Sequence, residues 1–128
     1  MPHLIVEYSE NLEAALDISA FCNRLREAAC AIDAFPSAGV RVRAFPARHY
    51  SIADGNPAHG FIDISVRLRA GRPQDVKEKA VQSLFQAAES FVATYMKSHP
   101  LALSIEMRDI DPTLSPKTGS IRSHLKDC

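Results

Sequence analysis

The chain has 128 residues, enough for one domain that buries roughly two-thirds of the surface its unfolded form exposes. Fifteen basic and fifteen acidic residues cancel, so no overall charge favours binding to nucleic acid or to an anionic membrane. No stretch is apolar for long enough to span a bilayer, and the N-terminus lacks the basic and apolar regions of a signal peptide, so we expect no membrane partner.

The chain opens with MPHLIVEYS, where a proline follows the initiator methionine. Residues 3–8 are rich in β-branched and aromatic types and predict a strand. Methionine before a small residue is often removed, which would leave Pro2 with a basic secondary amine at the start of that strand. Pro2 is therefore a candidate general base, although Met-Pro also begins many unrelated proteins.

A helical period follows the first strand. Apolar side chains recur at steps of three and four between Ile18 and Ile32, which is typical of a helix with one buried face. Asp17 is a suitable N-cap because its carboxylate can accept from the free amides of the first turn. Pro36 and Gly39 then interrupt the pattern.

Two alternating segments come next, on either side of a loop. Residues 39–45 (GVRVRAF) and 61–70 (FIDISVRLRA) alternate between apolar and polar or bulky side chains, as strands with one buried face do. The loop at 46–60 contains the turn signals Asp54-Gly55 and Asn56-Pro57. These segments predict the second and third strands.

The second helix is predicted from Pro73 to about residue 97. Proline is favoured at the first helical position, where its missing amide hydrogen costs nothing, and His99-Pro100 ends the pattern. Residues 101–110 (LALSIEMRDI) alternate as a last strand. From about residue 110 onward the chain is polar and rich in turn-forming residues.

The order βαβ, loop, βαβ predicts an α+β fold over residues 1–128, with a polar C-terminal tail. Two βαβ units would form a two-layer sandwich, a four-stranded sheet with both helices on one face. The other face is mixed and small, so we expect it to meet other subunits. Periodicity alone leaves two architectures open, the ferredoxin-like sandwich and the tautomerase fold, in which an N-terminal proline serves as the base.

The remaining motifs exclude several kinds of chemistry. Cys22, Cys30 and Cys128 make an odd count without a C-x-x-C pair, which argues against a disulfide framework or zinc site. We expect Cys22 and Cys30 to be small apolar residues of the first helix in a reduced, cytoplasmic protein. The histidines lack metal-ligand spacing, and no nucleotide-binding or serine-hydrolase motif occurs. We therefore expect no cofactor and no metal.

Arginines supply the local charge that a neutral protein needs in order to bind an anionic substrate. Arg41 and Arg43 share one strand face, Arg67 and Arg69 share another, and Arg72 precedes the second helix, where exposed amides attract anions. Guanidinium forks bind carboxylates and stabilise a developing enolate oxygen. A solvated outer face explains any single strand arginine, but together with Pro2, Arg41 and Arg72 are candidate catalytic residues.

Five segments together resemble the 5-carboxymethyl-2-hydroxymuconate isomerase family of the tautomerase superfamily. The segments are MPHLIVEYS, FPSAGVRVRAF, ADG, LRAGRP and LALSIEMRDIDPTL. They occur in this order over nearly the whole chain. After Leu114 the match becomes loose. The resemblance implies a cofactor-free homotrimer that acts on a small poly-carboxylate. It also implies that Pro2 is the base and then the acid, and that Arg41 and Arg72 bind carboxylates or polarise the 2-oxo group.

The reaction implied by this resemblance is a keto–enol (1,3-allylic) proton shift. It would convert 5-carboxymethyl-2-hydroxymuconate to its conjugated 2-oxo isomer in the degradation of homoprotocatechuate, the ring-cleavage route from 4-hydroxyphenylacetate. Two alternatives stay open from the residues. One is a tautomerase of another small enol acid such as phenylpyruvate, and the other is a non-catalytic ferredoxin-like ligand-binding module.

Overall fold

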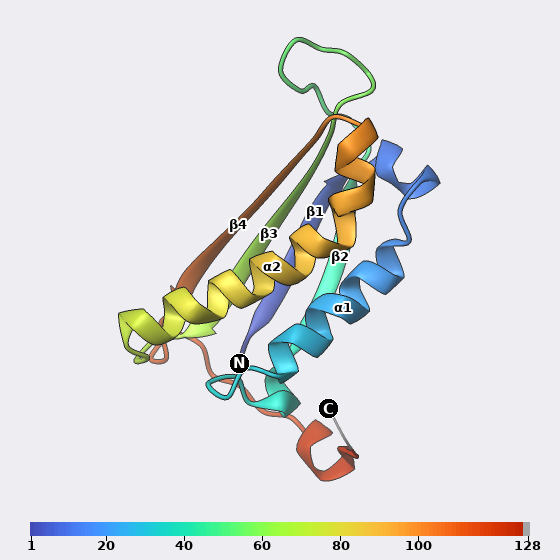
Figure 1. The fold of residues 1–128 in the computed structure, drawn as a ribbon. Helices are drawn as coiled ribbons and strands as arrows, with labels where there is room; N and C mark the ends of the chain where they lie inside the picture. Colours follow the sequence, from blue (N-terminus) through green and yellow to red (C-terminus); the bar gives the residue numbers. More distant parts are fainter. Residues whose placement is uncertain (127–128) are drawn as a thin grey trace.

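The computed structural model describes residues 1–126 as a four-stranded sheet with two helices on one face (Figure 1). The elements are β1 (His3–Ser9), α1 (Ile18–Cys30), β2 (Arg41–Ala47), β3 (Gly60–Arg69), α2 (Gln74–Ser98) and β4 (Leu101–Ile110). Three short 3-10 turns, Glu10–Ala14, Ser37–Gly39 and Ile121–His124, were not predicted. The α+β two-layer sandwich predicted from the βαβ repeat is confirmed.

The strands lie in the order β2-β1-β3-β4. Within each βαβ unit the strands are parallel, β1 with β2 and β3 with β4, while β1 and β3 pair antiparallel at the centre. The register places His3 of β1 opposite both Arg41 of β2 and Arg67 of β3. One end of the sheet therefore holds the beginnings of β1 and β2 and the last residues of β3 and β4.

The core lies between the sheet and the helices because alternate strand residues point to the helix side. Phe21 of α1 meets Phe91 of α2 edge to face, with ring centroids 5.2 Å apart, which joins the two helices over the sheet. The fully buried side chains are predominantly aliphatic and include Leu4, Val6, Leu25, Ile62, Ile64, Val66, Leu68, Leu84 and Val92. This arrangement confirms the apolar faces predicted from the alternating segments.

The two helix starts differ in how well the sequence predicted them. The Asp17 side chain accepts from the Ala20 amide at 2.9 Å, so its expected N-cap role is confirmed. Pro73 is the N-cap of α2 rather than its first residue, because its ψ of 152° is extended and the helix begins at Gln74. That prediction was wrong by one position.

The cysteines depart from expectation at one position. Cys22 is a free thiol in α1, and burial raises its pKa, which makes it less reactive. Cys30, the last residue of α1, is disulfide-bonded, so the prediction that both are unmodified apolar residues was wrong for Cys30. A disulfide depends on which sulfurs the fold brings within bonding geometry, and an odd count in the sequence does not reveal that.

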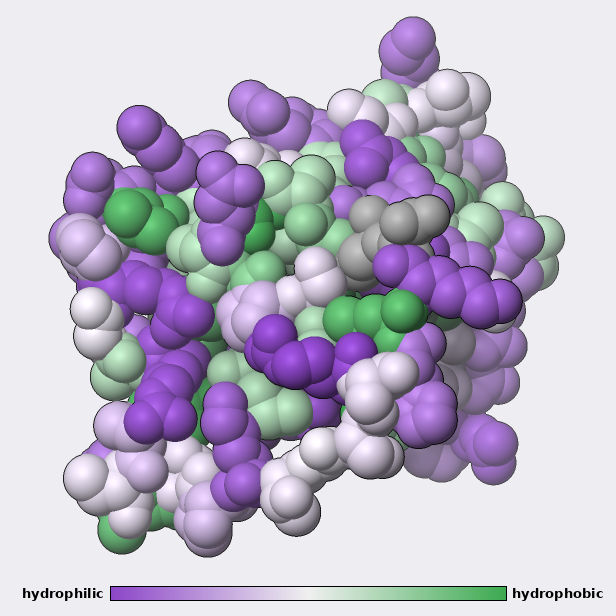
Figure 2. All heavy atoms as spheres, turned by 90° about the horizontal axis from the view of Figure 1, so that it is seen from below, coloured by the Kyte–Doolittle hydropathy of each residue, from purple (hydrophilic) through white to green (hydrophobic). Residues whose placement is uncertain are grey.

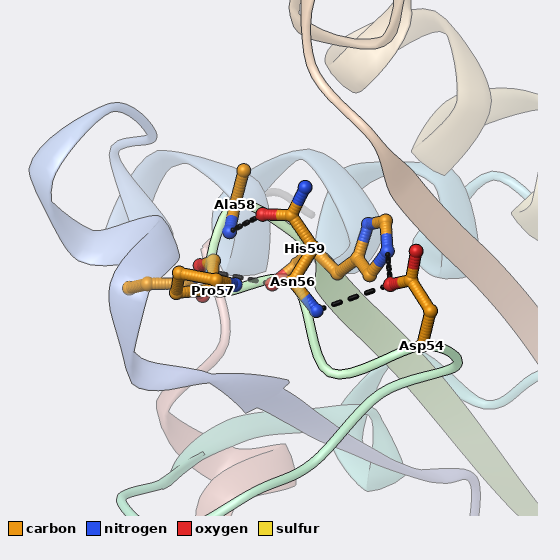
Figure 3. A network of polar contacts seen from close by, with 6 residues as sticks. Asp54, Asn56, Pro57, Ala58 and His59 are labelled. Atoms are coloured by element: carbon orange, nitrogen blue, oxygen red, sulfur yellow. Dashed lines mark hydrogen bonds and ion pairs between the residues drawn. The ribbon is translucent and has the colours of Figure 1, made fainter.

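The loop between β2 and β3 lies at the opposite end of the sheet from the N-terminus (Figure 1). Asp54 organises it by accepting from the Asn56 amide at 3.1 Å and pairing with His59 Nε2 at 2.7 Å (Figure 3). These two contacts hold the pKa of the Asp54 carboxyl below its usual value. Asn11 anchors the loop by donating to the His59 carbonyl at 2.8 Å. The Asp54–His59 pair is thus a loop contact, distant from Pro2.

The two helices of residues 1–126 are not suited to a membrane. Neither α1 nor α2 combines the length and the apolar character that crossing a bilayer requires.

Leu84 provides a test of the core. The side chain is fully buried in α2, so Leu84→Ala should lower the free energy of unfolding by about 2–5 kcal/mol through the cavity it leaves. Urea unfolding measures the change. Gln82→Ala, an exposed site on the same helix, is the control and should change stability by less than about 0.5 kcal/mol. Equal losses in both variants would contradict the proposed packing.

Candidate active site

Pro2 lies at the end of the sheet where β1 and β2 begin and where β3 and β4 end. Its side chain is fully buried, and its carbonyl accepts from the Arg41 amide at 3.3 Å, which holds it beside the first residue of β2. His3 is partly exposed while Leu4 is fully buried, so the alternation predicted for this strand begins at Pro2. A group attached to the Pro2 nitrogen is therefore held by a fixed backbone.

The chain's terminal amine, on Met1, shows what this environment does to a basic nitrogen. Burial, and then the positive charges of Lys117, Arg72, Arg69 and Arg41, lower the pKa of the Met1 amine from 8.0 to about 6. Both causes disfavour the charged ammonium form. An amine here is mostly uncharged near neutral pH, as a general base needs to be.

Two cavities border Met1, of about 220 and 270 Å³. They share four lining residues, Met1, Arg41, Lys117 and Thr118. The smaller one is also lined by Pro36, Ala38, Gly39, Gly119, Ile121 and Arg122. The larger one is also lined by His3, Arg67, Arg69, Ile110, Ser115 and Pro116. Of the two predicted catalytic arginines, Arg41 and Arg72, Arg41 therefore lines both cavities.

A wider groove of about 700 Å³ lies elsewhere, beside Tyr8 and α1. Its lining carries the carboxylates Glu13 and Asp17 and no lysine or arginine. These negative charges would repel an anionic substrate, so the N-terminal cavities are the better candidate site despite their smaller volumes.

Three arginines around Met1 have no acidic partner in the part of the chain that the structure describes. None of the ion pairs within residues 1–126 involves Arg41, Arg67 or Arg69. Arg41 Nη2 instead contacts the Met1 sulfur at 3.8 Å. These guanidinium groups retain donors for a ligand carboxylate, and seen from this end of the molecule hydrophilic side chains surround small hydrophobic patches (Figure 2).

His3 contributes a neutral ring rather than another cation. Burial, followed by the charges of Arg41, Arg43 and Arg67, lowers its pKa from 6.5 to about 4. At neutral pH the ring is uncharged, and its Nδ1, 3.2 Å from Arg43 Nη1, accepts from that guanidinium. This contact orients Arg43 on the helix-free face of the sheet.

Arg72 lies close enough to act on the Met1 amine, but its side chain is used structurally. Its Nε and Nη2 donate to the Ala34 carbonyl at 3.0 and 2.8 Å, and Nη1 donates to the Arg69 carbonyl at 3.0 Å. These bonds connect the turn after α1 to the end of β3. Arg72 does not line either N-terminal cavity.

Lys117 is the residue near the site that the sequence did not single out. After β4 the chain passes close to the N-terminus (Figure 1). Lys117 lines both cavities there. Of the neighbouring charges, Lys117 has the largest effect in lowering the pKa of the Met1 amine. The tail has no periodicity from which this position could be predicted. Arg67 lies opposite His3 in the strand register, and Arg67 and Arg69 both line the larger cavity beside Met1, which the sequence alone does not show.

Metal binding finds no support in residues 1–126. No group of three or more His, Cys, Asp or Glu side chains in this part of the chain is arranged to hold a metal ion.

Residues 2–125 match the family model described as 5-carboxymethyl-2-hydroxymuconate isomerase. The chain belongs to this family. It is 30% identical over 126 residues to the 5-carboxymethyl-2-hydroxymuconate Delta-isomerase of Escherichia coli, covering 98% of this chain and 100% of that protein. As a member of the 5-carboxymethyl-2-hydroxymuconate isomerase family, the protein is an isomerase.

Solved structures agree with this assignment. A 5-carboxymethyl-2-hydroxymuconate delta-isomerase has a TM-score of 0.89 at 31% identity, over 100% of this chain and 95% of that one. The isomerase of Deinococcus radiodurans R1 has the same TM-score at 27% identity, over 98% of this chain and 95% of that chain. Native fused 4-OT, at 23% identity, shares the fold, with a TM-score of 0.68 over 92% and 94% of the two chains.

Lys117→Gln tests the electrostatic account of the amine. Because the lysine charge disfavours the ammonium form, its removal should raise the pKa of the Met1 amine from about 6 toward 8.0. The pH dependence of acylation of the N-terminal amine measures this. Lys97→Gln, in the last turn of α2 at the far end of the sheet, should leave the pKa unchanged (Figure 1). An unchanged pKa in Lys117→Gln would refute the account.

Arg72→Lys tests the structural use of that guanidinium. Lysine keeps the charge but cannot bridge the Ala34 and Arg69 carbonyls, so the free energy of unfolding should fall by about 1–3 kcal/mol. Urea unfolding measures the loss. Arg41→Lys serves as the control, since the Arg41 guanidinium makes no hydrogen bond to a carbonyl among the described residues. A loss of stability in the control as large as in Arg72→Lys would argue against the bridge.

Proposed function

We propose that this isomerase ketonises 5-carboxymethyl-2-hydroxymuconate, with the Pro2 amine as the base, in the degradation of homoprotocatechuate. The observation that carries the proposal is the lowered pKa of the terminal amine, which lies between two cavities with unpaired cations. This amine belongs to Met1; removal of Met1 would instead free the neighbouring Pro2 nitrogen as a secondary amine beside the same arginines and lysine. The names of two similar isomerase structures and of the Escherichia coli relative support the substrate.

The proton balance of the reaction assigns two steps to one amine. The neutral Pro2 nitrogen takes the proton of the 2-hydroxyl group, and the electrons of the O–H bond form the C2 carbonyl. The electron pair of C2=C3 forms the new C3=C4 double bond, and the pair of C4=C5 takes a proton at C5 from the Pro2 ammonium, which restores the amine. Since the conjugated product gains a C3=C4 double bond, the proton moves over five atoms, from the 2-hydroxyl oxygen to C5, rather than over the three of the 1,3-allylic shift that the resemblance implied.

Arg41 and Arg72 have different parts in this proposal. Arg41 lines both cavities without an acidic partner, so it would bind a substrate carboxylate and stabilise the oxyanion that develops at C2. Arg72 uses three donors on backbone carbonyls and lowers the pKa of the amine by its charge. Its role is then electrostatic rather than direct binding.

A homotrimer is the proposed assembly. The helix-free face of the sheet carries Phe45, which is 54% exposed, next to charged residues, and such a mixed face is suited to contact with other subunits. A fused 4-OT with the same fold is described as a symmetric trimer, at 16% identity and a TM-score of 0.68.

The cytoplasmic location stays a prediction, and the disulfide at Cys30 argues against it.

Phenylpyruvate or another small enol acid is the second candidate substrate. The number of unpaired cations favours a poly-carboxylate, because each additional carboxylate can bind a separate guanidinium or ammonium group. Membership of an isomerase family does not favour the third possibility, a non-catalytic ferredoxin-like module.

Protein with and without Met1 tests the proline base. Retained methionine makes the Pro2 nitrogen an amide without basicity, so kcat/KM for the hydroxymuconate dienol should fall about 100- to 10,000-fold. Ultraviolet-monitored ketonisation by mass-verified samples measures it. In the processed form, kcat/KM should decrease as pH falls through the amine pKa, which should lie below its ordinary value. Equal, slow rates from both forms would disprove the mechanism.

A further inference from the structure

Gly39 is a glycine whose backbone does not require one. It lies in the 3-10 turn Ser37–Gly39 just before β2, is buried, and is absent from the positive-φ residues of the described chain. A Cβ at this position would lie 3.2 Å from Met1 Cα and Cγ and 3.3 Å from Met1 Cβ. These are the three atoms nearest to such a Cβ, and the distances are shorter than most Cβ contacts in proteins. The missing side chain thus leaves room for the group attached to the Pro2 nitrogen.

Met1 borders cavities of different character. The cavity that includes Gly39 has apolar walls from Pro36, Ala38 and Ile121, together with Arg122 and the shared cations. The other has Arg67 and Arg69 beside those shared cations. Because Met1 lines both, its removal would join them into one space around the Pro2 nitrogen. Gly39 would then face the position where substrate approaches the base.

The reaction defines which part of the substrate occupies that position. The amine must return a proton to C5, so C5 must come within about 3–3.5 Å of the Pro2 nitrogen. C5 also carries the carboxymethyl branch, whose first carbon is one bond away. On the proposed mechanism, the volume that Met1 fills in this structure, against Gly39, is the space next to C5 in which this branch would fit.

We propose that Gly39 is a specificity-determining residue of this isomerase, and that the absence of its side chain accommodates the branch on the proton-accepting carbon. This inference rests on the proposed proline mechanism. It divides the site into two functions: the arginines hold the carboxylate of the enol acid, and Gly39 decides whether the reacting carbon can carry a substituent.

Gly39→Ala, measured on processed protein, tests this division with a matched pair of substrates. 5-Carboxymethyl-2-hydroxymuconate and 2-hydroxymuconate differ only in the branch at C5. The added methyl group should lower kcat/KM for the branched substrate roughly ten- to two-hundred-fold, while kcat/KM for the unbranched one changes less than about twofold. Equal losses for both substrates, or no loss for either, would overturn the proposal.

Two further measurements separate the possible failures. If processed wild-type protein turns over neither substrate, the proposed function fails, and Gly39 is then judged by binding alone. Calorimetry with the unreactive pair butane-1,2,4-tricarboxylate and glutarate provides that readout, since these also differ only by a carboxymethyl branch. In wild-type protein, removal of Met1 should raise the affinity for both acids. The factor by which it rises should be at least about five times larger for the branched acid than for glutarate. An equal gain for both acids contradicts the role of Gly39 even if the alanine variant does not fold.

Discussion

The antiparallel pairing of β1 with β3 is the constraint on which the candidate site depends. It sets His3 opposite Arg67, so the last residues of β3 lie next to the beginning of the chain. The parallel partner of β1 adds Arg41 from the other side. A strand of ten residues spans roughly 33 Å, so with β3 reversed Arg67 and Arg69 would lie at the opposite end of the sheet from Pro2. One pairing thereby converts separate charges into a group around one nitrogen.

This group of charges explains how a protein of zero net charge can attract an anion. Arg41, Arg67 and Arg69 lie near one another without acidic partners among residues 1–126, and the proposed poly-carboxylate substrate would relieve their mutual repulsion. The same charges make an ammonium unfavourable and so keep the terminal amine available as a base. In the proposed mechanism, substrate binding and activation of the base therefore have a common electrostatic origin.

The fold and the activity are separable in this architecture. Fused 4-OT has the same two-layer arrangement at 23% identity, whereas membership of the isomerase family is shown by residues 2–125 matched as a whole. The sheet provides a rigid end on which a terminal amine is held, and we propose that the residues around that end select the substrate. The hydrogen bonds from Arg72 to the Ala34 and Arg69 carbonyls help to hold this end of the sheet and have no part in the proposed selection of substrate.

The sequence by itself determined the elements and their order, because alternation along strands and the helical period of α1 and α2 are local properties. It also supplied Pro2 and Arg41 as candidates. Only the tertiary structure decided that Arg72 binds backbone carbonyls, that Lys117 reaches the N-terminus, that Cys30 is disulfide-bonded and that Gly39 faces Met1. Each of these depends on contacts between segments far apart in the chain, and local patterns carry no information about which distant segments the packing of the sheet brings together.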